Sequence, residues 1–311
     1  MEKGDVPGEW YAPTQPIPSK PPAYERTGVS VADLIDFTPE LRAEAEKRAS
    51  KSKMGPIFTP PVVSKVGGPL ATLSRAQAGT NWFGGSYDPE THTVYVFSSG
   101  AIGAYGLVPP NPGQSDMEYV QGNAESGART TGGAGSSAGG GRTGEPAAAP
   151  AGRGGRGGEA AGGEGGGGGL SVRGLPLGKP PYGRISAIDL NQGVIKWQIA
   201  PGETPDNVKN NPALKGVTIP RTGRPGMIGT LVTKTLVIAG EGGFATTPSG
   251  QRGAMLRAYD KATGNEMGAV YMPAPQSGSP MTYMLNGKQY IVIAVSGGSY
   301  SAELLAFRLP N

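Results

Sequence analysis

Hydrophobic and polar residues alternate in short runs through the second half of the chain, and turn residues separate these runs. The clearest case is GRISAIDLNQGVIKWQIA at residues 183–200, where two alternating runs flank the turn Asn191-Gln192-Gly193. A period of two places successive side chains on opposite faces of a strand, and glycine supplies the positive φ that closes a tight turn. The pattern therefore predicts a β-hairpin.

A second stretch, LRAYDKATGNEMGAVYM at residues 256–272, repeats this hairpin. The shared pattern A-x-D-x-x-x-G is matched at Ala187, Asp189 and Gly193 and again at Ala258, Asp260 and Gly264. A looser copy, GGSYDPETHTVYVFSS, keeps the same spacing between Asp88 and His92. An Asp at the end of a strand can accept hydrogen bonds from the backbone of the following turn. We therefore interpret Asp189 and Asp260 as structural caps rather than catalytic acids.

Repeated hairpins predict an all-β fold, because one hairpin cannot bury both of its faces and must stack on its neighbours. Further hairpins are expected at residues 230–240 and 281–295, and residues 303–309 form a last strand. Trp197 is large enough to pack between neighbouring sheets. We predict radial stacking into a β-propeller, although the pattern alone also allows a solenoid or an antiparallel sandwich.

A short helical insertion is expected near the N-terminus. After a Pro-rich segment at residues 1–22, interpreted as polyproline-like chain or plain linker, Ser30 and Asp33 can form a capping box. Thr38 can cap a helix that has Pro39 at its first position. The following sequence, PELRAEAEKRASKSK, predicts an exposed helix with a solvated, charged face.

From residue 114 to 170 the composition collapses to Gly, Ala, Ser and Arg, which predicts a disordered loop inserted between two blades. Its GRGGRGG segment, around Arg153 and Arg156, resembles a nucleic-acid-binding RGG box. Residues 120–181 contain no aromatic side chain to stack on bases, so we expect no nucleic-acid partner. The predicted division is residues 1–113 for the N-terminal segment, helical insertion and first blade elements, 114–170 for the insertion, and 171–311 for the C-terminal blades.

Composition excludes several kinds of site. The chain has no cysteine and a single histidine, so thiolate metal sites, cysteine nucleophiles and multi-histidine centres are excluded. The histidine, His92, is interpreted as a turn residue, since His enters the left-handed region with some ease. Hydrophobic residues make up only 36% of the 311 residues, beside 54 Gly and 30 Pro, and the net charge is +4. No run of 18 or more apolar residues is present.

Several strings in register resemble the pyrroloquinoline quinone (PQQ) dependent dehydrogenases, the quinoprotein glucose and alcohol family. They are PTQPIPSKPP, LIDFTPELRAEA, GPIFTPP, TNWFGGSYDPET, GRPGMIGTLVTKTLVIAGEGG, GAMLRAYDKATG, YMPAPQSGSPMTYMLNGKQYIVIAVSGG and LLAFRLP. The resemblance runs from Val6 to Pro310 except for the central insertion, and corresponds to the C-terminal half of the family. It implies about three to four blades of an eight-bladed propeller.

The resemblance also implies a function and a cofactor. It implies oxidation of a sugar or alcohol hydroxyl, with electrons passing to a quinone or cytochrome, in the periplasm. It implies PQQ with Ca²⁺ or another divalent cation, whose ligands lie mostly outside this chain. Asn81 and Trp82 match a cofactor-contacting motif, and Gly297 and Gly298 match the close approach of the last blade. No catalytic residue and no metal ligand is assigned, because those family positions precede this sequence.

Two questions stay open at this stage. Without the missing blades we expect the chain to be inactive and to pair with a separate N-terminal half-propeller or with itself. MEKGDVPGEWY shows no signal peptide, which suggests a truncated or split reading frame. A non-catalytic propeller scaffold for protein–protein interaction is the alternative function.

Overall fold

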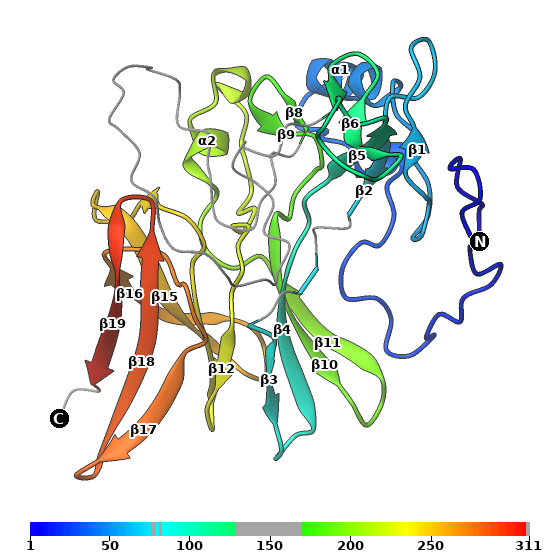
Figure 1. Ribbon diagram of the computed structural model, residues 1–311. Coiled ribbons are helices and arrows are strands. Elements are labelled where there is room, and N and C mark those ends of the chain that lie inside the picture. The colour runs from blue at the N-terminus through cyan, green and yellow to red at the C-terminus, as the bar shows by residue number, and fades with distance from the viewer. Residues whose placement is uncertain (76–78, 81–82, 129–169, 309–311) are drawn as a thin grey trace.

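Three antiparallel sheets fan out in the lower part of the molecule (Figure 1). The computed structural model describes residues 1–75, 79–80, 83–128 and 170–308. The first sheet contains β3 (Gly85–Asp88), β4 (Thr93–Ser99), β10 (Gly183–Asp189) and β11 (Val194–Ile199). The second contains β12 (Thr230–Val232), β13 (Leu236–Gly240), β15 (Arg252–Asp260) and β16 (Glu266–Met272), with the short β14 (Ala245–Thr246) beside β15. The third contains β17 (Met281–Leu285), β18 (Lys288–Gly297) and β19 (Tyr300–Arg308). The predicted all-β architecture of stacked propeller blades is confirmed.

The turns form as the repeated pattern predicts. Asp189 Oδ1 accepts hydrogen bonds from the backbone nitrogens of Asn191 and Gln192 at 2.9 and 3.0 Å. Asp260 Oδ1 accepts from the backbone nitrogen of Thr263 at 2.8 Å. The glycines that close these two turns, at positions 193 and 264, have φ of 64° and 77°. Both aspartates are therefore turn caps.

The third, looser copy of the pattern occupies a different place in its sheet. Its turn joins β3 to β4, at the β3 edge of the first sheet. The turns of the other two copies join β10 to β11 and β15 to β16, at the opposite edges of their sheets. His92 has φ of 48° there, is exposed, and its Nδ1 lies 3.0 Å from the Tyr87 hydroxyl. The prediction that His92 is a surface turn residue is confirmed.

The position expected for the central insertion is wrong. It does not separate two blades, because β4 and β10 are neighbours within the first sheet and Gly183 pairs with Ser99. Residues 100–182 leave and re-enter the same sheet, so two hairpins distant in sequence make one blade. The backbone pairing of β4 with β10 buries both strands, which neither hairpin could achieve alone.

Order also extends further into this insertion than expected. The stretch predicted to be disordered from residue 114 contains β6 (Val120–Asn123) and β7 (Gly127–Ala128). Val120 pairs with Val108 of β5 (Gly103–Val108), and the backbone nitrogen of Ala124 donates to Ser64 Oγ at 2.8 Å. These hydrogen bonds to β5 and to Ser64 order a segment that has little apolar area. Residues 129–169, including Arg153 and Arg156, lie outside the described residues.

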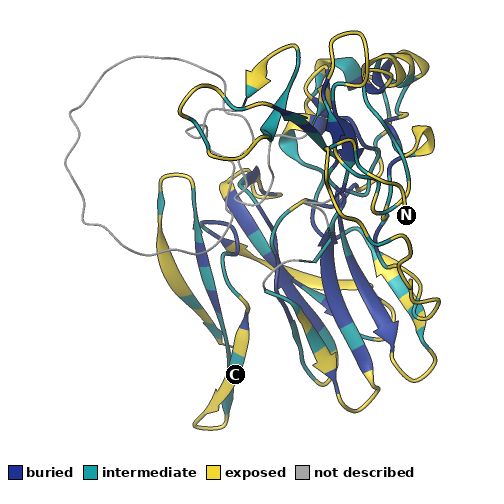
Figure 2. Ribbon diagram, turned by 45° about the vertical axis from the view of Figure 1, so that its right-hand side comes forward, coloured by how far each residue is buried: buried dark blue, intermediate teal, exposed yellow. Residues whose placement is uncertain are grey.

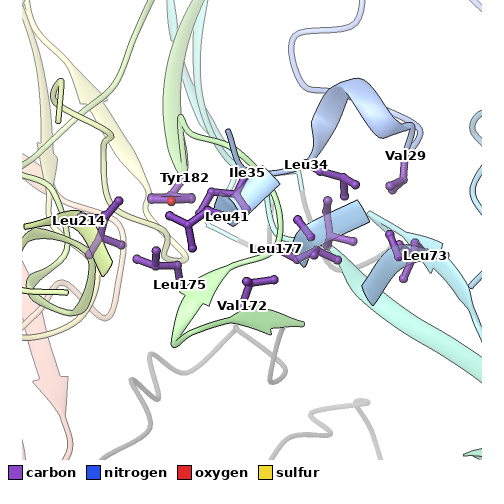
Figure 3. Close-up of a cluster of buried hydrophobic side chains, with 14 residues drawn as sticks. Val29, Leu34, Ile35, Leu41, Leu73, Val172, Leu175, Leu177, Tyr182 and Leu214 are labelled. Atoms are coloured by element: carbon purple, nitrogen blue, oxygen red, sulfur yellow. The ribbon is translucent and has the colours of Figure 1, made fainter. Parts of the chain in front are cut away.

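A second layer lies above the sheets in Figure 1. It contains α1 (Pro39–Ala49), α2 (Asp206–Lys209), the 3₁₀ turns η1 (Val31–Asp33) and η2 (Pro212–Leu214), β1 (Val62–Val63), β2 (Thr72–Ser74), β5 to β7, β8 (Ser171–Val172) and β9 (Leu175–Pro176). Its core joins distant segments, among them Leu34, Leu73, Val172 and Leu214, which Figure 3 shows gathered in one cluster. No helix among the residues described has the length and apolar character needed to cross a membrane.

The α1 helix is less exposed than the charge pattern predicted. Thr38 caps it, accepting from the Leu41 backbone nitrogen at 3.3 Å, and Pro39 occupies its first turn, as expected. However, Leu41, Ala45 and Ala49 are almost completely buried in the upper core. Their spacing of four places them on one helix face. The charged residues cover only the remaining faces, so the prediction of an exposed helix is wrong for this apolar face.

Trp197 packs between the first two sheets, as predicted. Its ring lies 5.7 Å from the ring of Tyr95, and its Nε1 donates to the Lys261 carbonyl oxygen at 3.2 Å. The Tyr95 hydroxyl donates to the same oxygen at 3.1 Å. Lys261 Nζ in turn lies 2.7 Å from Asp88 Oδ2 of the first sheet. The β15–β16 turn is thus one of the points at which the first sheet contacts the second. Gly268 takes the register position equivalent to Trp197, so the second sheet has no tryptophan there.

Candidate functional site

Three loops meet where β3, β12 and β17 begin, and we call these three strands the inner strands of their sheets. Ser279, two residues before β17, donates from Oγ to the carbonyl oxygen of Phe83, two residues before β3, at 3.3 Å. Gly229, directly before β12, lies against both residues. A Cβ at Gly229 would come within 2.7 Å of Ser279 Oγ and 3.1 Å of Phe83 Cβ. Glycine therefore allows the three loops to approach one another at this end of the sheets.

The buried side chain of Gln276 ties the second sheet to the loop before the third. Its Oε1 accepts from the Gly240 backbone nitrogen at 2.6 Å. Its Nε2 donates to the carbonyl oxygens of Gly229 and Gly278 at 2.8 and 2.7 Å. Three hydrogen bonds from one buried amide fix the relative position of the two sheets. No sequence signal predicts this role, because Gln276 stands in an ordinary polar, Pro-flanked turn.

Gly297 and Gly298 make the turn between β18 and β19, with φ of 144° and 56°. Gly297 pairs with Tyr300 across the turn. A Cβ on either glycine would lie 3.4–3.5 Å from Phe244 Cε2, so this backbone passes close to the Phe244 ring. The turn geometry by itself accounts for both glycines, and their predicted contact with a cofactor stays a prediction.

Arg224 is a buried cation at the same end of the sheets, only 5% exposed. Its Nε donates to the Gly242 carbonyl oxygen at 3.2 Å, and its Nη2 donates to that of Phe244 at 2.9 Å. Its Nη1 is buried, and no described residue forms a hydrogen bond with it. Burial lowers the pKa of this guanidinium, although the nearby Glu241 carboxylate acts in the opposite direction. Arg224 thus fixes the loop that carries Phe244 and keeps one donor for an anionic group.

Asn81 and Trp82, the predicted cofactor-contacting pair, lie outside the described residues. The residues on either side are anchored at this same end of the sheets. Gly79 pairs with Ser99, and Thr80 Oγ1 donates to the Phe97 carbonyl oxygen at 2.8 Å. Phe83, which follows the pair, takes part in the junction of the three loops.

The described residues fit PQQ on one side. A flat tricarboxylate quinone needs stacking or close-packed surfaces on its faces and cationic or amide donors at its edge. Here the glycine turn provides a close-packed surface and Arg224 a cationic donor, while the Phe244 ring already has the Arg252 guanidinium 5.0 Å from its centroid. Within residues 1–75, 79–80, 83–128 and 170–308 there is no group of three or more His, Cys, Asp or Glu that could hold a metal ion.

Comparison with known proteins agrees with the resemblance found in the sequence. A family model described as the glucose/ethanol/alcohol dehydrogenase β-propeller domain matches residues 1–291. A probable quinate dehydrogenase (quinone) of Xanthomonas campestris pv. juglandis is 36% identical over 148 residues, covering 46% of this chain and 18% of that protein. A quinate/shikimate dehydrogenase (quinone) of Acinetobacter baylyi is 25% identical over 308 residues, covering 97% of this chain and 33% of that protein.

A glycerol dehydrogenase large subunit of Gluconobacter thailandicus is 27% identical over 329 residues, covering 99% of this chain and 38% of that protein. Among solved structures, the quinohemoprotein alcohol dehydrogenase of Comamonas testosteroni aligns with a TM-score of 0.37 and 17% identity, covering 78% of this chain and 28% of that one. The chain spans only 18% to 38% of the length of the three sequence relatives. The family model nevertheless covers most of the chain and its fold is a series of propeller blades, so the chain belongs to the PQQ-dependent glucose/ethanol/alcohol dehydrogenase β-propeller family.

Proposed function

We propose that this chain is the C-terminal portion of a PQQ-dependent dehydrogenase that oxidises a sugar or alcohol hydroxyl. When bound, PQQ would accept the two electrons of that oxidation, and a quinone or cytochrome would take them onward in the periplasm. The chain would provide one wall of the cofactor site, formed by Asn81, Trp82, Gly297 and Gly298. Ca²⁺ or another divalent cation would bind beside PQQ, mostly through ligands outside this chain.

The observation that carries this proposal is the junction of the three loops. Phe83, which directly follows the Asn81-Trp82 motif, meets Gly229 and Ser279 there. The residues that flank the motif are therefore anchored at the end of the sheets where the inner strands begin, which supports a position of the motif near the propeller axis. A cofactor on the propeller axis would be reached from this position.

The third sheet supports a partner that completes the propeller. Its outward face carries Met281, Tyr283 and Leu304, which are 52%, 39% and 75% exposed, and Tyr283 stacks on Tyr290 at 5.2 Å. Figure 2 shows this sheet mostly in the colours of exposed and intermediate residues, beside the buried strands of the first two. It has three strands where the other blades have four, so the β19 edge is unpaired among the residues described. We expect a separate half-propeller, or a second copy of the chain, to cover this face.

The same exposed face favours the second candidate function, a non-catalytic propeller scaffold. An apolar surface at the end of a blade stack can bind another protein without any cofactor chemistry. The two functions differ in whether the junction of the three loops binds PQQ.

Measuring whether the chain binds PQQ distinguishes the dehydrogenase function from the scaffold function. The purified chain is titrated with PQQ and Ca²⁺, following cofactor absorbance, alone and with a polypeptide that supplies the remaining blades of a homologous propeller. We expect tight binding and dye-linked oxidation of alcohols or sugars only with the partner, and inactivity of the chain alone. Asn81→Ala should weaken PQQ binding by roughly tenfold, the value of one buried hydrogen bond. Asn191→Ala, in an exposed turn, is the matched control. Absence of PQQ binding in both preparations would leave the scaffold function.

A further inference from the structure

A cavity of about 590 Å³ lies in the upper layer, apart from the junction of the three loops. Residues 23–28 of the N-terminal segment, residues 55–61 and the end of β2 surround it. Apolar side chains form much of its wall, including Ile57, Phe58 and Leu73. This volume is typical of sites for small organic molecules, which combine apolar walls with a few polar groups.

Two guanidinium groups also line this cavity, those of Arg26 and Arg75. Arg75 has a side chain only 2% exposed, and all three of its nitrogens have protein partners. Arg26 is more accessible, with 19% of its side chain exposed. Its Nη2 donates to the carbonyl oxygens of Lys179 and Pro181 at 3.0 and 3.1 Å, which fixes the orientation of the group. Its Nε is buried and has no hydrogen-bond partner within the described part of the chain.

The charges around the cavity do not balance. Among the residues that the structure describes, three arginines, including Arg184, face two carboxylates, Glu25 and Asp33. Glu25 Oε1 pairs with Arg184 and lies 3.7 Å from Arg26 Nε, beyond hydrogen-bond distance. Burial, followed by the positive charges of Arg75 and Arg184, lowers the pKa of Arg26. An anion beside Arg26 would supply the missing negative charge and a partner for the remaining donors.

We propose that this cavity binds a small organic carboxylate with a ring-sized apolar body. The carboxylate would accept hydrogen bonds from Arg26, and the body of the molecule would pack against Ile57 and Phe58. An inorganic anion would fill little of the volume, and a neutral apolar molecule would leave the guanidinium charge uncompensated. The inference goes beyond the proposed dehydrogenase activity, because it requires neither PQQ nor the missing blades.

The test is calorimetric titration of the full chain with cyclohexanecarboxylate and with cyclohexanecarboxamide, which has nearly the same shape and no charge. We expect saturable binding of the carboxylate that is at least about tenfold tighter than that of the amide, since hydrogen bonds to charged groups are the stronger ones. Arg26→Gln should weaken carboxylate binding by at least about tenfold. Arg48→Gln removes an equal charge from an exposed position of the same layer and should leave binding unchanged.

A second variant keeps the test independent of the folding of Arg26→Gln. Phe58 is 54% exposed, so Phe58→Ala should fold normally and weaken carboxylate and amide binding alike by several-fold. The proposal is overturned if neither compound binds saturably, if the amide binds as tightly as the carboxylate, or if Arg48→Gln weakens binding as much as Arg26→Gln. Failure of PQQ to bind would not affect this result.

Discussion

Gly264→Ala tests how closely the first two blades are packed. Gly264 closes the β15–β16 turn with φ of 77°, a conformation that costs a non-glycine residue about 1–2 kcal/mol. A Cβ there would also lie 2.9 Å from Trp197 Cε3 and 2.9 Å from Ile199 Cγ2, both on the first sheet. An indole ring held between sheets cannot move aside easily, so overpacking should add about 1–3 kcal/mol. We therefore expect Gly264→Ala to lower the free energy of unfolding by about 2–5 kcal/mol in total.

Gly287→Ala is the matched control. Gly287 closes the β17–β18 turn with nearly the same φ, 72°, but a Cβ there would have nothing within 4 Å. Gly287→Ala should therefore lower the free energy of unfolding only by the cost of the positive φ, about 1–2 kcal/mol. Urea unfolding followed by circular dichroism measures both variants, and the difference between them isolates the contact between blades. Equal losses would refute the argument that Gly264 is required by packing.

A double variant tests whether Trp197 is the side chain that the added methyl group at position 264 contacts. Trp197→Phe alone removes part of the inter-sheet contact and should destabilise the chain. Combined with Gly264→Ala, the smaller ring leaves room for the added methyl group. The double variant should therefore lose less stability than the sum of the two single losses, by about 0.5–3 kcal/mol. Additive losses would show that the Ala side chain is accommodated without touching the ring.

Three further changes test other contacts. Burial would raise the pKa of Asp88, but hydrogen bonds, the largest from Lys261, outweigh it and lower that pKa. The stability that this pair gives is therefore present above about pH 4 and is lost as the pH falls through the lowered value. Denaturation at pH 7 and pH 3 should show a smaller pH-dependent loss for Asp88→Asn than for the unchanged chain, and identical losses would contradict this sign. Glu25→Ala should lower the free energy of unfolding by about 3–5 kcal/mol, measured by thermal denaturation, because it leaves the mostly buried Arg184 without its carboxylate. A change below about 0.5 kcal/mol would show that water replaces the pair. Leu304→Glu, on the outward face of β19, should reduce self-association in sedimentation experiments, and unchanged association would place the contact elsewhere.

The hairpins could be predicted because each depends on residues close together in the sequence. An Asp cap and a Gly four residues later determine a turn, whatever the rest of the chain does, and the turns at Gly193 and Gly264 follow this rule. Asn286-Gly287 determines the β17–β18 turn in the same way, with φ of 49° and 72°. Local turn chemistry therefore gave the number and positions of most strands.

The assembly of the hairpins could not be predicted in the same way. The first blade depends on the pairing of Ser99 with Gly183, which a period-two pattern does not encode. The apolar face of α1 is built from Leu41 and two alanines, too weak a signal beside its many charges. The junction of the three loops and the cavity beside Arg26 likewise combine residues from separate segments, so only the folded chain brings them together.

The two outward faces of the blade stack differ in chemistry, and this difference indicates where a partner would bind. On the first sheet, Phe97 and Ile185 point toward the second sheet, so Ser98 and Arg184 point outward. Both outward side chains bond Glu25 of the N-terminal segment, with Ser98 Oγ at 2.9 Å from Oε2. That face therefore carries polar groups that the N-terminal segment of the chain itself already bonds, whereas the outward face of the third sheet is apolar and exposed. A stack of blades with one occupied end and one open end should recruit its partner through the third sheet.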